Sequence, residues 1–216
     1  MPVVRILTWN VCDLFYERYR GNVPRKKAEL SIRAQQHGCS AICAQEAWLP
    51  HRWFAYDTQW KFPMGDGLAS RPTAGWRHCA FTCAAGEDAV VHKGFACRDM
   101  GDYVLYNVHL QADHAIGWGN AADIRGRQLW QLRQHMATHG ARPVIAVGDF
   151  NHVLVPETGE TCASAQNGLD GALARNVPGQ LAVYEEDTDL SDHPMVVVSF
   201  WVDSIKSACV RGNECT

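Results

Sequence analysis

Five short polar motifs, each at one end of a strand-like apolar run, constrain the fold of this 216-residue chain more than any other feature. Four of them follow such a run and the fifth precedes one, so all place polar side chains at strand ends. Loops at the ends of a rigid sheet are where proteins commonly present chemistry. The pattern therefore predicts sheets whose ends gather polar groups. In chain order the motifs are Trp9-Asn10, Gln45-Glu46, Asn107-Val108-His109, Gly148-Asp149-Phe150-Asn151 and Ser191-Asp192-His193.

Strand-like and helix-like segments alternate along the chain without a linker. Pro24 opens one predicted helix and Gly38 ends it, while Gly140 ends a second. Strands mixed with two helices predict one α+β domain over residues 1–216, built as a sandwich. We expect residues 50–91 to be irregular and 156–167 to form a polar loop. The predicted strands are 3–9, 40–45, 79–83, 103–110, 143–148, 169–175 and 195–202, and the predicted helices are 25–37 and 124–139.

Composition excludes a few classes. With 47% hydrophobic and 20% charged residues, the chain has the make-up of an ordinary soluble globular protein. No stretch approaches the roughly 20 consecutive apolar residues that span a bilayer. The N-terminus shows no signal-peptide pattern, so we expect a cytoplasmic protein. A net charge of −3 neither requires nor excludes a nucleic-acid partner.

Nine cysteines form no recognisable zinc set. The spacings Cys39-x3-Cys43 and Cys79-x3-Cys83 lack the Cys-x2-Cys pair or spaced histidines of such sites. Buried free thiols, which behave as small apolar groups, are the favoured interpretation. Cys209 and Cys215 would close a short disulfide only in an oxidising compartment.

Two of the motifs offer ligands for a divalent metal. Glu46 supplies a carboxylate directly after a predicted buried strand, and Asn10 can add an amide oxygen. Oxygen ligands of this kind suit hard cations such as Mg²⁺. A bound cation would place positive charge against phosphoryl oxygens, as phosphodiester cleavage requires.

The remaining motifs offer acid–base groups. The imidazole of His193 titrates near neutral pH and could deprotonate a water, with Asp170 as its orienting carboxylate. A protonated His109 could stabilise charge on a phosphoryl group. Asp149 and Asn151 lie two residues apart and point to one side if the backbone is extended.

Each of these residues also has a purely structural interpretation. His193, Asp149 and Glu46 could be surface or capping residues, and His109 could be a hydrogen-bonded core histidine. Asp192 could merely shape its loop. The basic residues Arg25, Lys26, Lys27, Arg125, Arg127 and Arg133 are expected on solvated helix faces, and His135 and His139 are expected at the surface.

These motifs, together with Leu169-Asp170 and Pro194, resemble the endonuclease/exonuclease/phosphatase superfamily, from about Arg5 to Phe200 and in the same order. The resemblance implies the deoxyribonuclease I-like fold, a four-layer α/β/β/α sandwich. It also implies Mg²⁺, or alternatively Mn²⁺, at Glu46, with Asn10 and Asp192 close by. Cys12 departs from the pattern, because many members carry Asp or Asn at this position. The roles that the resemblance implies are phosphate contacts from Asn151 and His109, nucleophile positioning or leaving-group assistance from Asp149, and a general base, His193, paired with Asp170.

A second resemblance concerns the substrate. His92-Lys93-Gly94-Phe95, followed by Asn107-Val108-His109-Leu110-Gln111-Ala112, is similar to neutral sphingomyelinases. It implies a Mg²⁺-dependent phosphodiesterase acting on a phospholipid, with Lys93 among the substrate contacts, and we expect a monomer. The alternatives are an endonuclease or exonuclease acting on DNA or RNA, and an inactive binding scaffold.

Overall fold

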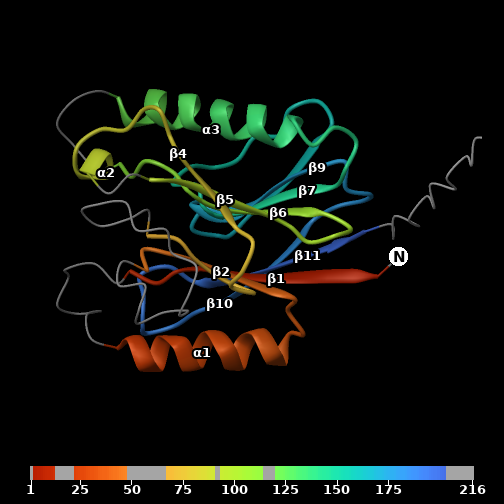
Figure 1. Ribbon diagram of the computed structural model, residues 1–216. Coiled ribbons are helices and arrows are strands. Elements are labelled where there is room, and N and C mark those ends of the chain that lie inside the picture. The colour runs from red at the N-terminus through yellow and green to blue at the C-terminus, as the bar shows by residue number, and fades with distance from the viewer. Residues whose placement is uncertain (1, 13–21, 48–66, 91–92, 114–119, 203–216) are drawn as a thin grey trace, which may run out of the picture.

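Two β-sheets are stacked face to face between helices (Figure 1). The computed structural model describes residues 2–12, 22–47, 67–90, 93–113 and 120–202. Helix α1 lies on the outer face of one sheet and α3 on the outer face of the other (Figure 1). This is the predicted four-layer α/β/β/α sandwich of the deoxyribonuclease I-like type. No helix within the described ranges is long and apolar enough to cross a membrane.

The first sheet has five strands in the order β10-β11-β1-β2-β3. Strands β1 and β2 are parallel, so Asn10 and Gln45 end side by side. Strand β11 runs antiparallel to β1 and pairs Val196 with Thr8, which brings the start of β11 to the same end. The bounds are β1 Val3–Asn10, β2 Ala41–Gln45, β3 Ala69–Arg71, β10 Ala182–Glu186 and β11 Met195–Trp201.

The second sheet has six strands in the order β4-β5-β6-β7-β9-β8. Strands β6 and β7 are parallel and place His109 beside Asp149. Strand β9 is antiparallel to β7 and pairs Asp170 with Asp149. The bounds are β4 Arg77–Ala80, β5 Gly94–Asp99, β6 Val104–His109, β7 Val144–Asp149, β8 Glu160–Ser164 and β9 Asp170–Arg175.

The two long helices agree with their predicted positions. Helix α1, Val23–Gln36, has Pro24 in its first turn and is followed by Gly38 at φ +62°. Helix α3, Ala121–Ala137, begins three residues earlier than expected, because the side chain of Asn120 accepts a hydrogen bond from Ala122 N and caps it. A short helix α2, Glu87–Val90, precedes β5.

The sandwich contains one apolar cluster in each of its three interlayer spaces. Ile6, Leu105 and Val198 belong to the central cluster between the sheets. Leu30 and Ala34 of α1 pack onto the first sheet. Leu129, Leu132 and Met136 of α3 face inward onto the second sheet. Ile32 of α1, by contrast, is 49% exposed.

A buried polar bridge connects the two sheets near the site end. Gln45 Nε2 donates to Asn107 Oδ1 at 2.7 Å. Asn107 Nδ2 donates to the carbonyl oxygens of Ala44 and Ala69 and to Ser70 Oγ. Because buried amides are costly unless they are hydrogen-bonded, this bridge favours one register between the sheets.

Several expectations about loops and charged side chains are wrong. Residues 160–164, expected within a polar loop, form strand β8, which pairs with β9. Lys26 is fully buried because its Nζ donates to the carbonyl oxygens of Val11 and Cys12. Arg125 is 6% exposed and donates to Gln111 O. Arg133 is largely covered because it pairs with Glu160.

The cysteines in the described ranges are free thiols. Burial raises the pKa of Cys39 to about 11, which keeps this thiol protonated and unreactive at neutral pH. Among the described cysteines, Cys12, Cys43 and Cys97 are buried as expected, whereas the other four are half-buried. The structure does not describe the residues of the expected Cys209–Cys215 disulfide, nor Trp48, Trp53, Trp60 and Trp118. Trp76 lies within the described ranges and is buried by packing.

Replacing Gly148 with alanine is expected to lower the free energy of unfolding by about 3 kcal/mol. Gly148 has φ +146°, and a Cβ atom there would lie 2.0 Å from Val108 O of the neighbouring strand. Urea unfolding measures the loss. Gly126→Ala is the matched control: nothing lies within 4 Å of its added Cβ in α3, so it should stabilise by about 1 kcal/mol. Equal stability of Gly148→Ala and the wild type would contradict the close strand contact.

The end of α3 is held to the second sheet by a shared hydroxyl. Tyr106 Oη lies 2.6 Å from His135 Nδ1 and 2.8 Å from His139 Nε2. The hydroxyl proton can serve only one imidazole, so the other ring donates to Oη. Both histidines were expected at the surface, but both are half-buried.

The free energy of unfolding is therefore expected to fall in acid because of these two histidines. Burial, together with the charge of Arg77 and the partner histidine or Arg142, holds the pKa of both imidazoles below 6.5. As pH falls below about 6.5, the two imidazoles bind protons in the unfolded chain but not yet in the folded chain, and stability is lost. Between pH about 7.5 and pH about 5, the free energy of unfolding should fall more for the wild type than for the double variant His135→Gln/His139→Gln. An equal fall in both proteins would contradict the assignment.

Candidate active site

The strand ends of both sheets meet at one end of the sandwich. Parallel strands β1 and β2 deliver Asn10 and Glu46 there from the first sheet, and β6 and β7 deliver His109 and Asp149 from the second. The loop before β11 adds His193. The structure thus brings together side chains that lie up to 183 positions apart in the sequence.

Asp149 lies at the centre of this group. Asn10 Nδ2 donates to its Oδ2 at 2.9 Å, and the backbone N–H of Asn151 donates to its Oδ1 at 2.8 Å. His109 Nε2 lies 3.5 Å from the same Oδ2. Asp149 is 1% exposed, so these partners are what allow a carboxyl group to be buried there.

His109 stands between two carboxylates. Its Nε2 lies 3.7 Å from Glu46 Oε1 as well as 3.5 Å from Asp149 Oδ2. The imidazole is fully buried, whereas the Glu46 side chain keeps 15% of its surface exposed. Glu46 is thus the carboxylate through which a ligand from solvent can reach this pair.

His193 forms a tight contact with Asp170. Its Nδ1 lies 2.6 Å from Asp170 Oδ2, a short hydrogen bond between a ring N–H and a carboxylate. Asn167 Nδ2 donates to the same oxygen at 2.6 Å, and Trp9 Nε1 donates to the backbone carbonyl of His193 at 3.0 Å. With Nδ1 engaged in this way, Nε2 is left facing Asp149, 3.9 Å from its Oδ2.

The buried charges shift two pKa values. Burial lowers the pKa of His193, but the hydrogen bond and charge of Asp170, with the charges of Asp149 and Asp192, outweigh burial and raise it. Burial, and then the charge of Asp170, raise the pKa of Asp149. Without a metal, therefore, protons are held at this site near neutral pH.

Three residues at this end have backbone in the left-handed region. Glu46 has φ +54°, Asn151 has φ +48° and Cys12 has φ +45°. Such conformations are uncommon for residues with a Cβ and cost free energy that the surrounding contacts must supply. Two of the three are predicted site residues, and the third is the position that departs from the family pattern.

Asp192 and Cys12 lie together at the margin of the site. Asp192 is exposed and hydrogen-bonds the Cys12 thiol. Burial raises the pKa of that thiol to about 12, and the charges of Glu46 and Asp192 add to the effect. Asp192 therefore has access to solvent on the side of Glu46.

Lys93, a predicted substrate contact, is buried and bonded to groups of the protein itself. It is 3% exposed, and its Nζ lies 3.1 Å from Asp88 Oδ1 and donates to Leu110 O at 3.0 Å. Asn151 Nδ2 donates to the same carbonyl at 3.2 Å. These contacts favour a role in fixing the loop after His109.

Three supporting residues were missed in the sequence. Asn167 holds Asp170, Ser191 Oγ donates to Asn10 O at 2.7 Å, and Lys26 holds the loop after Asn10. The burial of Lys26 could be predicted from the sequence, because Lys26 lies on the same face of α1 as the buried residues Val23, Leu30 and Ala34. The other two lie in loops without periodicity.

The donor set fits a hard divalent cation. Glu46 and Asp192 present carboxylate oxygens that are reached from solvent, and Asn10 keeps a second lone pair on Oδ1, which accepts from Cys12 N. A second arrangement is also present in the described residues: ligand atoms of Asp149, Asp170 and His193 lie within 4.8 Å of one another. The short His193–Asp170 hydrogen bond favours proton transfer over ligation for that trio.

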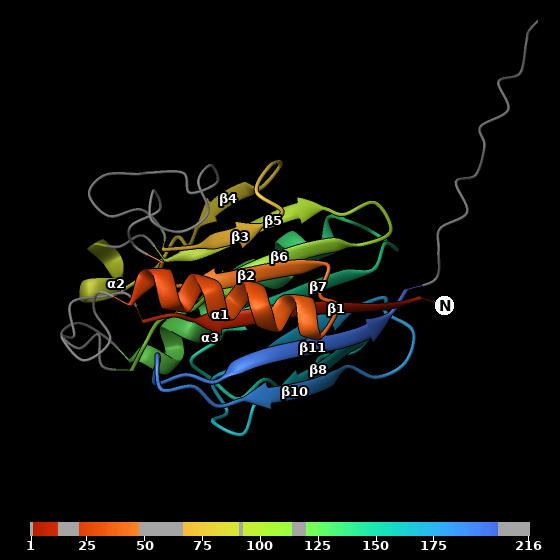
Figure 2. The same ribbon diagram turned by 90° about the horizontal axis from the view of Figure 1, so that it is seen from below.

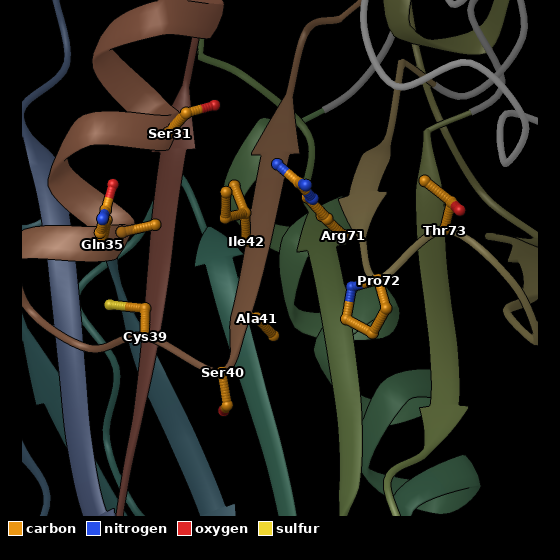
Figure 3. A pocket seen from close by; sticks show the side chains of 10 residues that line it. Ser31, Gln35, Cys39, Ser40, Ala41, Ile42, Arg71, Pro72 and Thr73 are labelled. Carbon is orange, nitrogen blue, oxygen red and sulfur yellow. The ribbon is translucent and has the colours of Figure 1, made fainter.

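The pocket shown in Figure 3 is separate from this site. It has a volume of about 560 Å³ and lies where α1 meets the edge of the first sheet. Ala41 and Ile42 line it at the start of β2, whereas Glu46 follows the other end of that strand (Figures 2 and 3). The pocket therefore has no part in the chemistry described above.

Known structures share this architecture. SmcL superposes with a TM-score of 0.70 at 18% identity, covering 92% of this chain and 99% of that chain. D. rerio TDP2 complexed with a single-strand DNA product gives 0.60 at 14% identity, covering 92% and 98%. Beta toxin from Staphylococcus aureus gives 0.59 at 15% identity, covering 90% and 99%.

Sequence comparison adds no closer relative. No family model matches the chain, and no curated protein matches it. At these identities the superposition establishes the fold, and the deoxyribonuclease I-like fold predicted from the sequence is confirmed.

Proposed function

We propose that this chain is a Mg²⁺-dependent phosphodiesterase of the sphingomyelinase type. The observation that carries the proposal is the arrangement of two pairs of side chains around Asp149. His193 and Asp170, 2.6 Å apart, lie on one side of it, and Glu46 and His109 lie on the other. A base with its orienting carboxylate on one side, and a metal-type carboxylate with an imidazole on the other, are the parts that phosphodiester hydrolysis needs.

His193 acts as the general base. Asp170 holds Nδ1–H, which leaves Nε2 as the atom that takes a proton from the attacking water. Asn167 and the Trp9 contact fix the orientation of this pair. Asp170 also stabilises the imidazolium that forms.

The other side chains bind the phosphate and manage its charge. Glu46, with Asn10 and Asp192 nearby, would hold Mg²⁺, which when bound would supply positive charge against the phosphoryl oxygens. His109 and Asn151 contact those oxygens from the second sheet. Asp149 positions the nucleophile or gives a proton to the leaving oxygen, and its raised pKa supports the second role.

Activity is expected to rise with pH. The raised pKa of His193 keeps the imidazole protonated near neutrality, whereas a base must be neutral. Loss of Asp170 removes the largest contribution that raises the pKa of His193, so Asp170→Asn should move the rising limb of kcat/KM to lower pH while also lowering the maximum. A pH–rate profile of wild type and variant tests this. An unmoved limb would show that Asp170 does not act on the base.

The substrate class rests on the Lys93-Gly94 and His109-Leu110-Gln111 resemblance to neutral sphingomyelinases. A nuclease is the second candidate, because one structure of the same fold holds a single-strand DNA product. An inactive scaffold is disfavoured, because a binding module needs no base paired with an orienting carboxylate.

Parallel assays separate the candidates. Purified protein with Mg²⁺ is offered sphingomyelin vesicles, supercoiled plasmid and single-stranded DNA. Phosphocholine release without DNA cleavage is the expected result. DNA cleavage alone, weakening with salt as phosphate contacts do, would replace the lipid proposal with the nuclease. Inactivity on all three would favour the scaffold.

A further inference from the structure

A second group of metal-type side chains lies on the other face of the second sheet. Along β6 alternate residues point to opposite faces, so His109 faces the active site while Tyr106 faces α3, among its apolar contacts. The group consists of Tyr106, His135, His139 and Cys97. None of these residues belongs to the proposed phosphodiesterase site.

The two imidazoles converge on one oxygen. His135 lies in the last turn of α3 and His139 four residues later, and both ring nitrogens lie within hydrogen-bond distance of Tyr106 Oη. His139 lies in the turn that follows α3, and this turn brings its ring to the same hydroxyl as His135. The ring centroids of the two histidines are 6.0 Å apart.

A thiol completes the surroundings of that oxygen. Cys97 pairs with Tyr106 across β5 and β6, and burial, followed by the nearby Cys97, raises the pKa of the Tyr106 hydroxyl. Tyr106 is fully buried, but both imidazoles keep part of their surface exposed. A cation from solvent can therefore reach the nitrogens without unfolding the helix.

We propose that His135 Nδ1, His139 Nε2 and Tyr106 Oη bind a zinc-type divalent cation that ties the end of α3 to the sheet. On binding, the hydroxyl proton leaves to solvent, and the imidazole whose N–H faces Oη moves that proton to its other ring nitrogen. Three metal–ligand bonds then form and a water takes the fourth position. A tetrahedral ion at about 2.0 Å from each ligand holds the ligands roughly 3.3 Å apart. The present contacts of 2.6 and 2.8 Å must therefore open by about 0.5 to 0.7 Å.

The nearby charges set the affinity. Arg77 of β4 is close enough to act on both imidazoles, and it is exposed. Asp99 is paired with Arg142 at 2.7 Å, so it does not neutralise Arg77. Arg77→Gln should therefore tighten cation binding severalfold, which a purely structural role for the histidines would not produce.

The test is a titration of the full-length protein with Zn²⁺, read out by equilibrium dialysis and by ultraviolet difference absorption. The wild type should bind one cation more than His135→Gln/His139→Gln and should show the tyrosinate band, which Tyr106→Phe lacks. Zn²⁺ should also raise the Tm of the wild type more than that of the double variant.

A matched control shows whether the bound cation belongs to this group of side chains. His152→Ala, in an exposed loop, should keep the wild-type stoichiometry and the tyrosinate band. Equal stoichiometry in the wild type and the double variant, or Zn²⁺ binding without a tyrosinate band, would overturn the proposal. Because these readouts need no substrate, their failure is separate from failure of the phosphodiesterase assignment.

Discussion

His193→Ala is expected to lower kcat by about 10²–10⁴-fold, the contribution of a positioned general base. The imidazole Nδ1 is held by Asp170 at 2.6 Å, and Nε2 is the ring nitrogen turned toward the rest of the site. Alanine removes both functions. Initial rates at saturating substrate and Mg²⁺ measure the effect.

The fold should survive this change. His193 lies in the loop before β11, and its side chain belongs to none of the apolar clusters. Circular dichroism and urea unfolding of the variant check this. His37→Ala, which removes an imidazole from the C-cap of α1, is the matched control and should keep full activity. Near-normal activity of His193→Ala would end the base assignment.

Glu46→Gln is expected to weaken Mg²⁺ affinity by about 100-fold, because a neutral amide replaces the carboxylate that solvent reaches. Isothermal titration calorimetry of the free protein measures this without any substrate. Asp102→Asn, in the hairpin between β5 and β6, removes one carboxylate elsewhere and should leave the affinity unchanged.

The same titration separates the two possible metal positions. If the ion were held by Asp149, Asp170 and His193, whose ligand atoms lie within 4.8 Å of one another, Glu46→Gln would bind normally and Asp170→Asn would not. That outcome would move the metal from Glu46 to the trio and would leave His193 without its role as base.

The sandwich was predictable because its signals are local and repeated. Strands such as β6 and β7 are fully buried and read as continuous apolar runs ending in a polar residue. Their parallel pairing then sets His109 beside Asp149. Strand β8, by contrast, is half-buried and carries Glu160 and Thr161, so its sequence resembles a polar loop.

Predicting the buried charges was harder. Lys26 shares the spacing of the buried residues of α1, but its burial depends on two backbone carbonyls of the loop after Asn10 that accept hydrogen bonds from its Nζ. No local pattern reveals such distant acceptors. The same holds for Lys93, whose partners are Asp88 and Leu110 O. A charge that finds its hydrogen bonds within the fold can be buried where composition alone predicts exposure.

The most direct test of a metal-dependent centre at these strand ends is hydrolysis of a simple phosphodiester, bis(p-nitrophenyl) phosphate, by the full chain with and without Mg²⁺. We expect p-nitrophenol release that requires the metal, increases with pH and is lost in His193→Ala. Hydrolysis that persists in the variant, or that is unchanged when EDTA removes the metal, would contradict a metal-dependent phosphodiesterase centre at these strand ends.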